Sequence, residues 1–582
     1  MNALLYKSKR IFKKKGSLIL LFFIILVFIF NYSSLSKYTS DQLSNYSQSS
    51  SNLGTDDDDN TIPFYKSNAA KPKTQIKEEN EKKSRLEKMK LIQQDLDEDK
   101  SGSRLVLGHT LFNKVFEILK KGEPKIPKLE RYKSDDRIYH AGYDGDSNVV
   151  FSEDYLSSFL QLTDDEVSSL QKSHKLVVDN LPEQIPKTLY KGNGIVYVGG
   201  GKFNWLALLS IKSLRSLGSK LPIEVVIPTM EEYEIDLCGR IFPALNAKCI
   251  LLEHSLGDAA MSKFKFKGYQ YKALALIVSS FENVLLVDAD NIPVHAPDYL
   301  FENEPFINTG LITWPDFWRR ATSPDYYKIA GIKINDKRVR FGYDDRDKDS
   351  KEVPLHDREG AIPDPTSESG QLMISKTSHT KELFLALYYN LYGPDYYYPL
   401  FSQGSDGEGD KETFLAATVA LDSSYYQVKK FLNAFGHFNM DHEFIGTGMG
   451  QYDPVEDYNL ERAKARQKEQ SKELNQDLEP ITKQPRILFV HANFPKLNPI
   501  SLRDEKKIFE KNGDRLRLYG PGMAKRVGYD FELVQWRNMH FLICELKVEV
   551  EVFKGNDNVE VCKEILDQLE HLEATVKDNE RD

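Results

Sequence analysis

Two aspartates, Asp288 and Asp290, stand one residue apart directly after the apolar run Val284–Val287. The run is typical of a buried β-strand, and residues i and i+2 of a strand point to the same side, so both carboxylates can converge on one cation. Mn²⁺ or Mg²⁺ would take oxygen ligands there and bridge them to a diphosphate. This pattern predicts transfer of a sugar from a nucleotide-sugar donor. The alternative is two solvated loop aspartates, with Asp290 capping a helix.

A histidine follows a second apolar run, Ile487–Val490, and is our candidate for the third metal ligand. Because His491 also stands at the carboxyl end of a predicted strand, it can reach the same edge of the fold as the two aspartates. Lys496, five residues later, is a candidate to hold a phosphate oxygen as a point charge. His437 is the rival ligand, and a loop histidine satisfied by hydrogen bonds is the alternative to a metal role.

Four apolar runs alternate with stretches of helical spacing from Lys187 onward. This β-α repetition predicts a doubly wound, mostly parallel sheet with helices on both faces. In such sheets, ligands bind at the carboxyl ends of the strands, where the two aspartates stand. The predicted strands are Gly194–Val198, Ile223–Ile227, Lys248–Leu252 and Val284–Val287, and the predicted helices are Trp205–Leu217, Glu231–Phe242 and Tyr269–Phe281.

Three residues are candidates for contact with the nucleotide or its phosphates. Lys202 and Asn204 come just after the first strand, and Lys272 lies in the helix that precedes the aspartate-bearing strand. For a lysine on a helix, a solvated surface position is the alternative. The glycines between the first strand and Lys202 lack the G-x-G-x-x-G spacing, so a dinucleotide-binding fold is not predicted.

Four residues are candidates for contact with the sugars. Asn308 follows an apolar-aromatic run, and Glu368 and Gln371 lead into the predicted strand Leu372–Ser375. Asp410 opens a predicted helix, where the alternative role is an N-cap. If a carboxylate nucleophile is used, Glu368 or Asp410 would supply it. We favour same-face attack assisted by the leaving phosphate, although the residues do not decide between the two.

Five sequence blocks, taken in order, resemble the fungal Golgi α-mannosyltransferase family. The blocks are Tyr197–Pro228, Val284–Trp318, Glu368–Lys376, Gly409–Phe414 and His491–Pro499. The nearest subgroup comprises the α-1,2-mannosyltransferases that branch N-linked mannan, and a related α-1,3 subgroup shares much of the pattern. The resemblance implies a GT-A-like Rossmann-type fold, GDP-mannose as donor, Mn²⁺ (or Mg²⁺) and retention of the α anomer.

This resemblance implies transfer of mannose to α-mannoside acceptors of N-glycan outer chains. The alternatives are an α-1,3-mannosyltransferase, another retaining hexosyltransferase, or a catalytically inactive scaffold of a Golgi mannan-synthesis complex. The intact set Asp288, Asp290 and His491 argues against the scaffold. The absence of a P-loop or kinase signature disfavours a phosphate-transferring enzyme.

The amino terminus is basic up to Lys15 and then apolar from Ser17 to Phe30. This predicts a signal anchor, with a cleaved signal peptide as the alternative, and the basic residues place the amino end in the cytosol. We therefore expect a single-pass type II Golgi membrane protein with a lumenal catalytic domain. The predicted parts are a cytosolic tail 1–16, an anchor 17–32, a disordered stem 33–100, a helical extension 101–186, a catalytic domain 187–545 and a tail 546–582.

Charge and cysteine usage narrow the class further. The net charge is −9 and basic residues gather only near the amino terminus, so binding to nucleic acid is not expected. The short spacings of the four cysteines favour the disulfides Cys238–Cys249 and Cys544–Cys562 among three possible pairings, with four free thiols as the alternative. Structural zinc is not predicted because no C-x-x-C motif occurs.

Overall fold

The computed structural model describes residues 82–91, 102–133, 137–138, 142, 149–342 and 352–579. These residues belong to one compact unit, 77–582. The predicted cytosolic tail and anchor, and most of the stem, lie outside the described residues. Within the described ranges, no helix is both long enough and apolar enough to cross a membrane.

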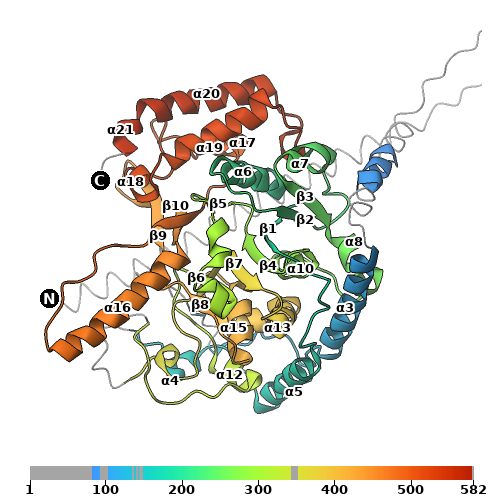
Figure 1. Cartoon of the computed structure of the whole chain (residues 1–582), viewed down its shortest axis with the longest axis vertical. Coiled ribbons are helices and arrows are strands. Elements are labelled where there is room, and N and C mark those ends of the chain that lie inside the picture. Colours follow the sequence, from blue (N-terminus) through green and yellow to red (C-terminus); the bar gives the residue numbers. More distant parts are fainter. Residues whose placement is uncertain are drawn as a thin grey trace, which may run out of the picture. The chain divides into compact units, whose positions relative to one another are not determined.

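The main sheet has seven strands in the order β3-β2-β1-β4-β7-β6-β8, and its first four strands are parallel (Figure 1). β7 runs antiparallel to β4 and to β6, and β8 runs parallel to β6. The predicted α/β class is thus confirmed, as a mixed sheet rich in parallel pairs. The strands are β1 (Asn193–Val198), β2 (Ile223–Ile227), β3 (Ala247–Leu251), β4 (Asn283–Val287), β6 (Leu311–Pro315), β7 (Ser367–Ser375) and β8 (Tyr426–Gln427).

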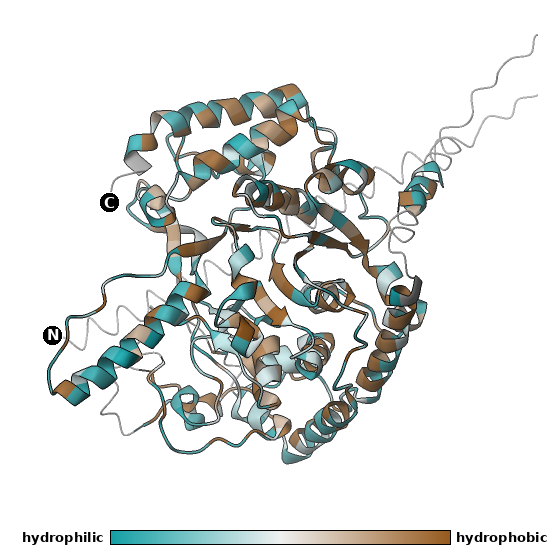
Figure 2. Cartoon of the chain, viewed as in Figure 1, coloured by the Kyte–Doolittle hydropathy of each residue, from teal (hydrophilic) through white to brown (hydrophobic). Residues whose placement is uncertain are grey.

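The central strands are continuous apolar runs because both faces of the sheet are covered. In β4, Leu285 and Val287 point into one hydrophobic core, whereas Val284 and Leu286 point into the other. Figure 2 shows this as brown strands between helices of mixed colour. Each apolar position in the run therefore contributes to one of the two cores, and the strand that leads to the candidate aspartates is held between them.

Helices from distant parts of the chain cover the two faces. One face carries α6 (Lys202–Ser216), α19 (Phe531–His540) and α20 (Asn558–Ala574), and the other carries α3 (Gly102–Lys121), α10 (Gln270–Val278) and α13 (Thr380–Leu391). α5 (Asp164–Asn180) begins with a capping box between Thr163 and Glu166 and packs against α3 and α12. Shorter helices connect these elements: α4 (Glu153–Leu156), α7 (Phe242–Ala244), α8 (Leu252–Leu256), α9 (Asp258–Met261), α11 (Phe306–Thr309), α12 (Pro324–Ala330), α14 (Tyr398–Ser402), α15 (Thr413–Ala420), α17 (Pro499–Asp504), α18 (Met523–Val527) and α21 (Val576–Asn579).

A second sheet is fully antiparallel, in the order β5-β11-β10-β9. Its strands are β5 (Asn291–Pro293), β11 (Ile487–His491), β10 (Phe444–Tyr452) and β9 (Asn433–Phe438). The strand expected before His491 is thus present, but it belongs to this sheet and not to the parallel one. β5 is the link between the sheets, because it begins directly after the turn that follows β4.

Both predicted disulfides, Cys238–Cys249 and Cys544–Cys562, are present. The second joins the residues just after α19 to α20, whose apolar side Val561, Ile565 and Leu572 lies in the main core. The segment after residue 545 is therefore tied to the catalytic unit by a covalent bond and by buried area. The boundary drawn at 545 from the sequence lies between two bonded cysteines.

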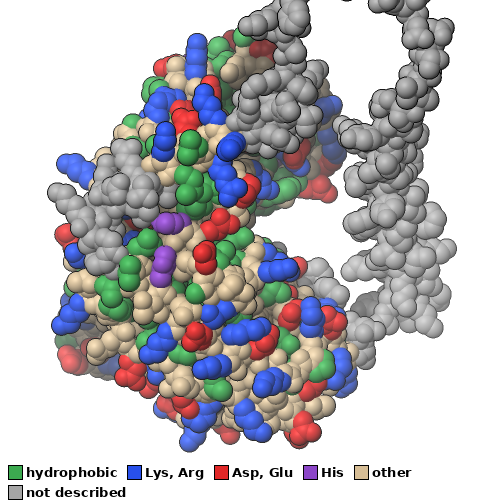
Figure 3. Space-filling view, turned by 90° about the vertical axis from the view of Figure 1, so that its right-hand side faces the viewer, with side chains coloured by type: hydrophobic (Ala, Val, Ile, Leu, Met, Phe, Trp, Pro, Cys, Tyr) green, Lys and Arg blue, Asp and Glu red, His purple; other side chains and the backbone are tan. Residues whose placement is uncertain are grey.

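The surface carries charges of both signs. On the face shown in Figure 3, Lys and Arg side chains alternate with Asp and Glu side chains. The polar stretch after Asp453 forms the long helix α16 (Pro454–Leu474). The side chain of Asp453, at the N-cap, accepts hydrogen bonds from the N–H groups of Val455 and Glu456 in the first turn. The residues of α16 beyond Leu460 are half-buried or exposed, as expected for a surface excursion.

A buried carboxyl in α19 makes the stability of the fold depend on pH. Glu532 accepts hydrogen bonds from the backbone N–H groups of Leu518 (3.1 Å) and Tyr519 (3.4 Å), yet burial raises its pKa from 4.5 to about 7. The folded state therefore holds this proton more tightly than the unfolded chain does. Its contribution to stability is complete below pH 4.5 and is lost as the pH rises through about 7.

Replacing this carboxyl with a neutral amide removes the effect. Glu532→Gln should raise the thermal unfolding midpoint at about pH 8 by about 3 °C, because the difference between 4.5 and about 7 corresponds to roughly 3 kcal/mol. Scanning calorimetry of the full chain checks this. At about pH 4, where both side chains are neutral, the two midpoints should agree. Glu505→Gln, at an exposed position, is the matched control and should change neither midpoint; a midpoint of Glu532→Gln below that of the native sequence at pH 8 would refute the account.

Candidate active site

The two aspartates lie in a turn between the sheets. β4 ends at Val287, and the N–H of Asn291 closes the turn by donating to the carbonyl of Asp288 (3.0 Å) before β5 begins. Asp288 and Asp290 therefore converge through this turn, and the strand alternation assumed from the sequence is not the cause. The carbonyl of Asp290 accepts from the N–H of Ala492 (3.0 Å), which fixes the turn to the end of β11.

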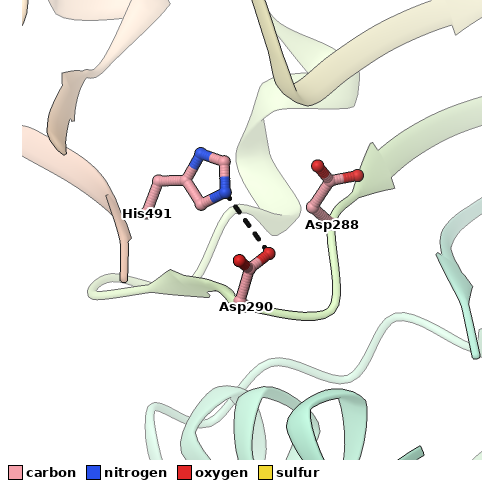
Figure 4. Close-up of side chains that lie close together, drawn as sticks. All are labelled: Asp288, Asp290 and His491. Atoms are coloured by element: carbon pink, nitrogen blue, oxygen red, sulfur yellow. Dashed lines mark hydrogen bonds and ion pairs between the residues drawn. The ribbon is translucent and has the colours of Figure 1, made fainter. Parts of the chain in front are cut away.

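The structure brings Asp288, Asp290 and His491 together (Figure 4). One ligand atom from each lies within 4.8 Å of the others, and His491 Nε2 is 3.3 Å from Asp290 Oδ1. Two carboxylates and one imidazole, largely shielded from water, suit a divalent ion such as Mn²⁺, which accepts nitrogen as well as oxygen ligands. The predicted ligand set thus fits a metal geometrically.

Glu368 and Gln371 hold His491 in place. Nδ1 of His491 lies 3.0 Å from Glu368 Oε1, and Glu368 Oε2 accepts from Gln371 Nε2 (2.7 Å). The Gln371 amide oxygen in turn accepts from Asn291 Nδ2. Such outer contacts set the orientation of a metal-ligating imidazole. Burial opposes protonation of His491, but the carboxylates of Glu368 and Asp288 act in the other direction, and the pKa of the imidazole is raised.

Lys272 is committed to the protein in this structure. Its ammonium donates to Asp288 Oδ2 (2.8 Å) and to the carbonyl and hydroxyl of Ser369 (3.0 Å each). Burial would lower its pKa, but Asp288 and Asp410 raise it above the ordinary value. Lys272 is thus a fixed positive charge beneath the carboxylates, and its three donors are already used, which does not match the direct diphosphate contact expected from the sequence.

Asp410 is 2% exposed and has an oxygen to spare. Its Oδ1 accepts from the Ser369 hydroxyl (3.2 Å), whereas its Oδ2 makes no hydrogen bond within the described part of the chain and lies 3.7 Å from Lys272 Nζ. Burial raises the pKa of this carboxyl. Asp410 is the first residue of the short 3-10 helix Asp410–Glu412, whose N-cap position is Gly409, so the N-cap role considered from the sequence is not realised.

Two further lysines add positive charge at this edge. Lys496 forms an ion pair with Asp290 Oδ2 and keeps 38% of its side chain exposed. Burial lowers the pKa of Lys496 to about 8, and repulsion from Lys202 and Lys272 acts in the same direction. Lys202 is exposed at the first residue of α6. Because Lys202 and Lys496 are accessible, they can meet the oxygens of a diphosphate.

Asn204 has a structural task. Its side-chain oxygen accepts from the N–H of Gly200 (2.7 Å), and its amide donates to the Glu232 carbonyl (3.1 Å) and to Glu234 Oε1 (2.7 Å). These bonds hold the glycine turn after β1 against the chain that follows β2. We therefore assign Asn204 to the support of this turn and not to direct contact with a nucleotide.

Asn308 lies away from the cluster. It is exposed in α11, just before β6 begins at Leu311. Leu311 pairs with Ile374 at the far end of β7, whereas Asp288 follows the opposite end of β4. The structure therefore does not bring Asn308 to the site, and the register that separates them cannot be seen in the sequence.

The rival ligand His437 is engaged elsewhere, since its Nδ1 lies 3.1 Å from the carbonyl of Leu518. Sequence reasoning missed Asn291 and Ser369, which brace the site from behind. Their positions directly beside Asp290 and Glu368 were the available signal.

Comparison with known proteins shows the family of this chain. The family model Mannosyl_trans3, which describes mannosyltransferases, matches residues 192–453. The α-1,2-mannosyltransferase MNN21 of Candida albicans is 54% identical, with 81% of this chain and 76% of that protein covered. The α-1,2-mannosyltransferase MNN2 of Saccharomyces cerevisiae is 40% identical, with 82% and 87% covered.

The chain belongs to this fungal α-1,2-mannosyltransferase family. The mannosyltransferase model spans the turn with Asp288 and Asp290 and the segments with Glu368 and Asp410, while His491 lies beyond it. Among solved structures, the glycosyltransferase GlyE of Streptococcus pneumoniae matches with 13% identity and a TM-score of 0.24, over 41% of this chain and 45% of that one. That TM-score is too low for any site residue to be assigned from GlyE.

Metal binding is the direct test of the three-residue set. Asp290→Ala should weaken Mn²⁺ binding to the full chain by at least roughly tenfold, since a ligand is lost where outer contacts alone are worth that much. The electron paramagnetic resonance signal of free Mn²⁺ measures this. His437→Ala, which changes a histidine outside the cluster, is the control and should bind Mn²⁺ normally; equal loss in both variants would refute the assignment.

Proposed function

We propose that this transferase moves mannose from GDP-mannose, with retention of the α configuration, onto α-mannosides of N-glycan outer chains, forming α-1,2 branches. The observation that carries the proposal is the convergence of Asp288, Asp290 and His491 at one edge of the sheet, next to accessible lysines. Names of relatives at 40–54% identity support the linkage. The donor and the stereochemistry follow from the resemblance and from the suitability of the site for a diphosphate.

The chain's residues divide the work as follows. Asp288, Asp290 and His491 would hold a divalent ion, which when bound neutralises charge on the departing diphosphate. Lys202 and Lys496 add positive charge on the accessible side, where the leaving group carries its negative charge. In the same-face route, the acceptor hydroxyl oxygen bonds to the anomeric carbon as the bond to the phosphate oxygen breaks. The hydroxyl proton passes to the diphosphate, so no enzyme-bound sugar forms.

The two buried carboxylates have different capacities for ligands. Glu368 has both oxygens engaged, with His491 and the N–H of Gly370 on one and Gln371 on the other. Asp410 has Oδ2 without a hydrogen bond in the described structure. Because a buried acceptor atom gains most from a partner, Asp410 is the better-placed group to accept a hydroxyl of the bound sugars. Glu368 acts through the orientation of His491.

The cellular setting is part of the proposal. The apolar segment 17–32 would anchor the protein in the Golgi membrane, with the catalytic unit in the lumen. Two disulfides within the described chain fit an oxidising compartment. If the carboxyl terminus is lumenal, a carboxyl-terminal tag in isolated Golgi vesicles should be protected from added protease. Digestion of the tag in intact vesicles would place both termini in the cytosol and contradict the proposal.

Linkage analysis tests the activity itself. The full chain, incubated with GDP-mannose, Mn²⁺ and an α-1,6-mannobiose acceptor, should yield an α-1,2-linked mannose, read by NMR. Asp290→Ala should lower kcat by at least roughly a hundredfold because it removes charge stabilisation worth several kcal/mol. An α-1,3-linked product would support the same active site but assign the enzyme to the α-1,3 subgroup. Absence of any transfer by the native sequence to any mannoside would favour the scaffold alternative.

Asp410 should affect turnover and leave metal binding intact. Asp410→Asn keeps the shape and the bond to Ser369 but weakens the acceptor for a sugar hydroxyl, so kcat/KM should fall by roughly tenfold to a hundredfold. Mn²⁺ affinity should stay within about twofold, since Asp410 is outside the ligand set. A mannosyl adduct trapped on Asp410 and identified by mass spectrometry would replace the same-face route with a covalent one.

A further inference from the structure

The hairpin formed by β9 and β10 extends past the metal-ligand cluster. Met449 of β10 pairs with His491, and the strand continues outward for five more residues to Phe444, which pairs with Phe438. At about 3.3 Å per residue, the tip lies roughly 16 Å beyond His491 along the strand. The tip is therefore at the same edge of the second sheet as the cluster, farther from the core.

One face of this hairpin is continuous with His491. Residues paired directly across antiparallel strands place their side chains on the same face, which links His491 to Met449 and Met449 to Ala434. β10 has a β-bulge between Gly446 and Gly448, whereas β9 continues without one. Alternation along β9 therefore places Gly436 and Phe438 on this face as well. Phe435 and His437 point to the other face, where Phe435 is buried in the core and His437 contacts the carbonyl of Leu518.

Two aromatic rings stand on that open face. Phe438 is 64% exposed and Phe444 is 48% exposed, and their ring centroids are 5.5 Å apart at 62°. A β-carbon added to Gly436 would collide with the carbonyl oxygen of Ile445 and lie 2.7 Å from the Phe444 ring, so the glycine allows both the close approach of the two strands and the position of the ring. Exposed aromatic side chains held in a defined arrangement indicate a binding surface.

We propose that Phe438 and Phe444 form a platform on which the acceptor glycan chain lies as it leads into the active site. The proposal rests on the proposed function, since it takes the acceptor to be a polymer of mannose. Sugar rings present apolar C–H faces that stack on aromatic rings, and a neutral polymer needs no charged partner on the platform. The continuity of this face with His491 favours the glycan over a partner protein or a membrane, which would have no reason to follow the sheet to the metal-ligand cluster.

The test compares a long acceptor with a short one. In the full chain, Phe438→Ala/Phe444→Ala should raise the KM for an α-1,6-mannan polymer by roughly tenfold, the size expected for the loss of two aromatic contacts. The KM for α-1,6-mannobiose, the KM for GDP-mannose and Mn²⁺ affinity should stay within about twofold, because a disaccharide bound at the cluster does not reach the tip. Phe438→Tyr/Phe444→Tyr keeps both rings and should restore the native KM.

A residue on the same strand supplies the matched control. Ile445 is 38% exposed, apolar and adjacent to Phe444, but strand alternation places it on the opposite face. Ile445→Ala should leave both KM values unchanged. The proposal is overturned if the alanine pair leaves the polymer KM unchanged, if it raises both acceptor KM values equally, or if Ile445→Ala has the same effect. An unchanged KM together with lost binding to phosphatidylcholine vesicles would instead assign the tip to a membrane. Failure of the native sequence to transfer mannose to either acceptor would count against the proposed function.

Discussion

Compensation between the clustered carboxylates and the cations beside them is the constraint on which this site depends. The carboxylates belong to Asp288, Asp290, Glu368 and Asp410, and the cations to Lys272, His491 and Lys496. An uncompensated carboxylate in such surroundings would cost several kcal/mol. Lys272 meets this need from the first turn of α10, and its bonds to Asp288 and Ser369 link the end of β4 to β7. The open side of the cluster is left to Lys496, which can move, and to ligands.

The second sheet makes the cluster possible. Asp290 and His491 are 201 residues apart in the sequence, and they meet because the three-residue strand β5 pairs with the end of β11. The same sheet carries its ladder outward through β10 and β9, so the metal-ligand edge and the exposed aromatic hairpin share one rigid support. α19 and α20 pack into the same hydrophobic core as β11, and the Cys544–Cys562 disulfide joins the segment after α19 to α20.

Much of this could be predicted from local pattern. The strand before Asp288 is a continuous apolar run because its alternate residues are buried in two different hydrophobic cores. His491 follows a similar apolar run. What the sequence could not reveal depends on distant pairing. β5 is too short to show a sequence pattern. The register of β6 on β7 places Asn308 at the edge of the sheet opposite the site. Asn204 and Lys272 use their side-chain donors in hydrogen bonds to distant residues of the protein, which the sequence does not reveal. The family blocks contain both Glu368 and Asp410, and the structure brings Asp410 to Ser369, the residue after Glu368, although nothing in the sequence separates an orienting carboxylate from one with an oxygen that makes no hydrogen bond in the described chain.

The central claim is that a divalent cation binds at the point where Asp288, Asp290 and His491 meet. Diffraction from crystals grown with Mn²⁺, recorded at the manganese absorption edge, tests it directly. The account predicts one anomalous peak in contact with all three side chains, with the Lys496 ammonium moved away from Asp290 and with Lys272 still bonded to Asp288. A peak bound elsewhere, or no peak at the cluster with Lys496 still paired with Asp290 at saturating Mn²⁺, would contradict it.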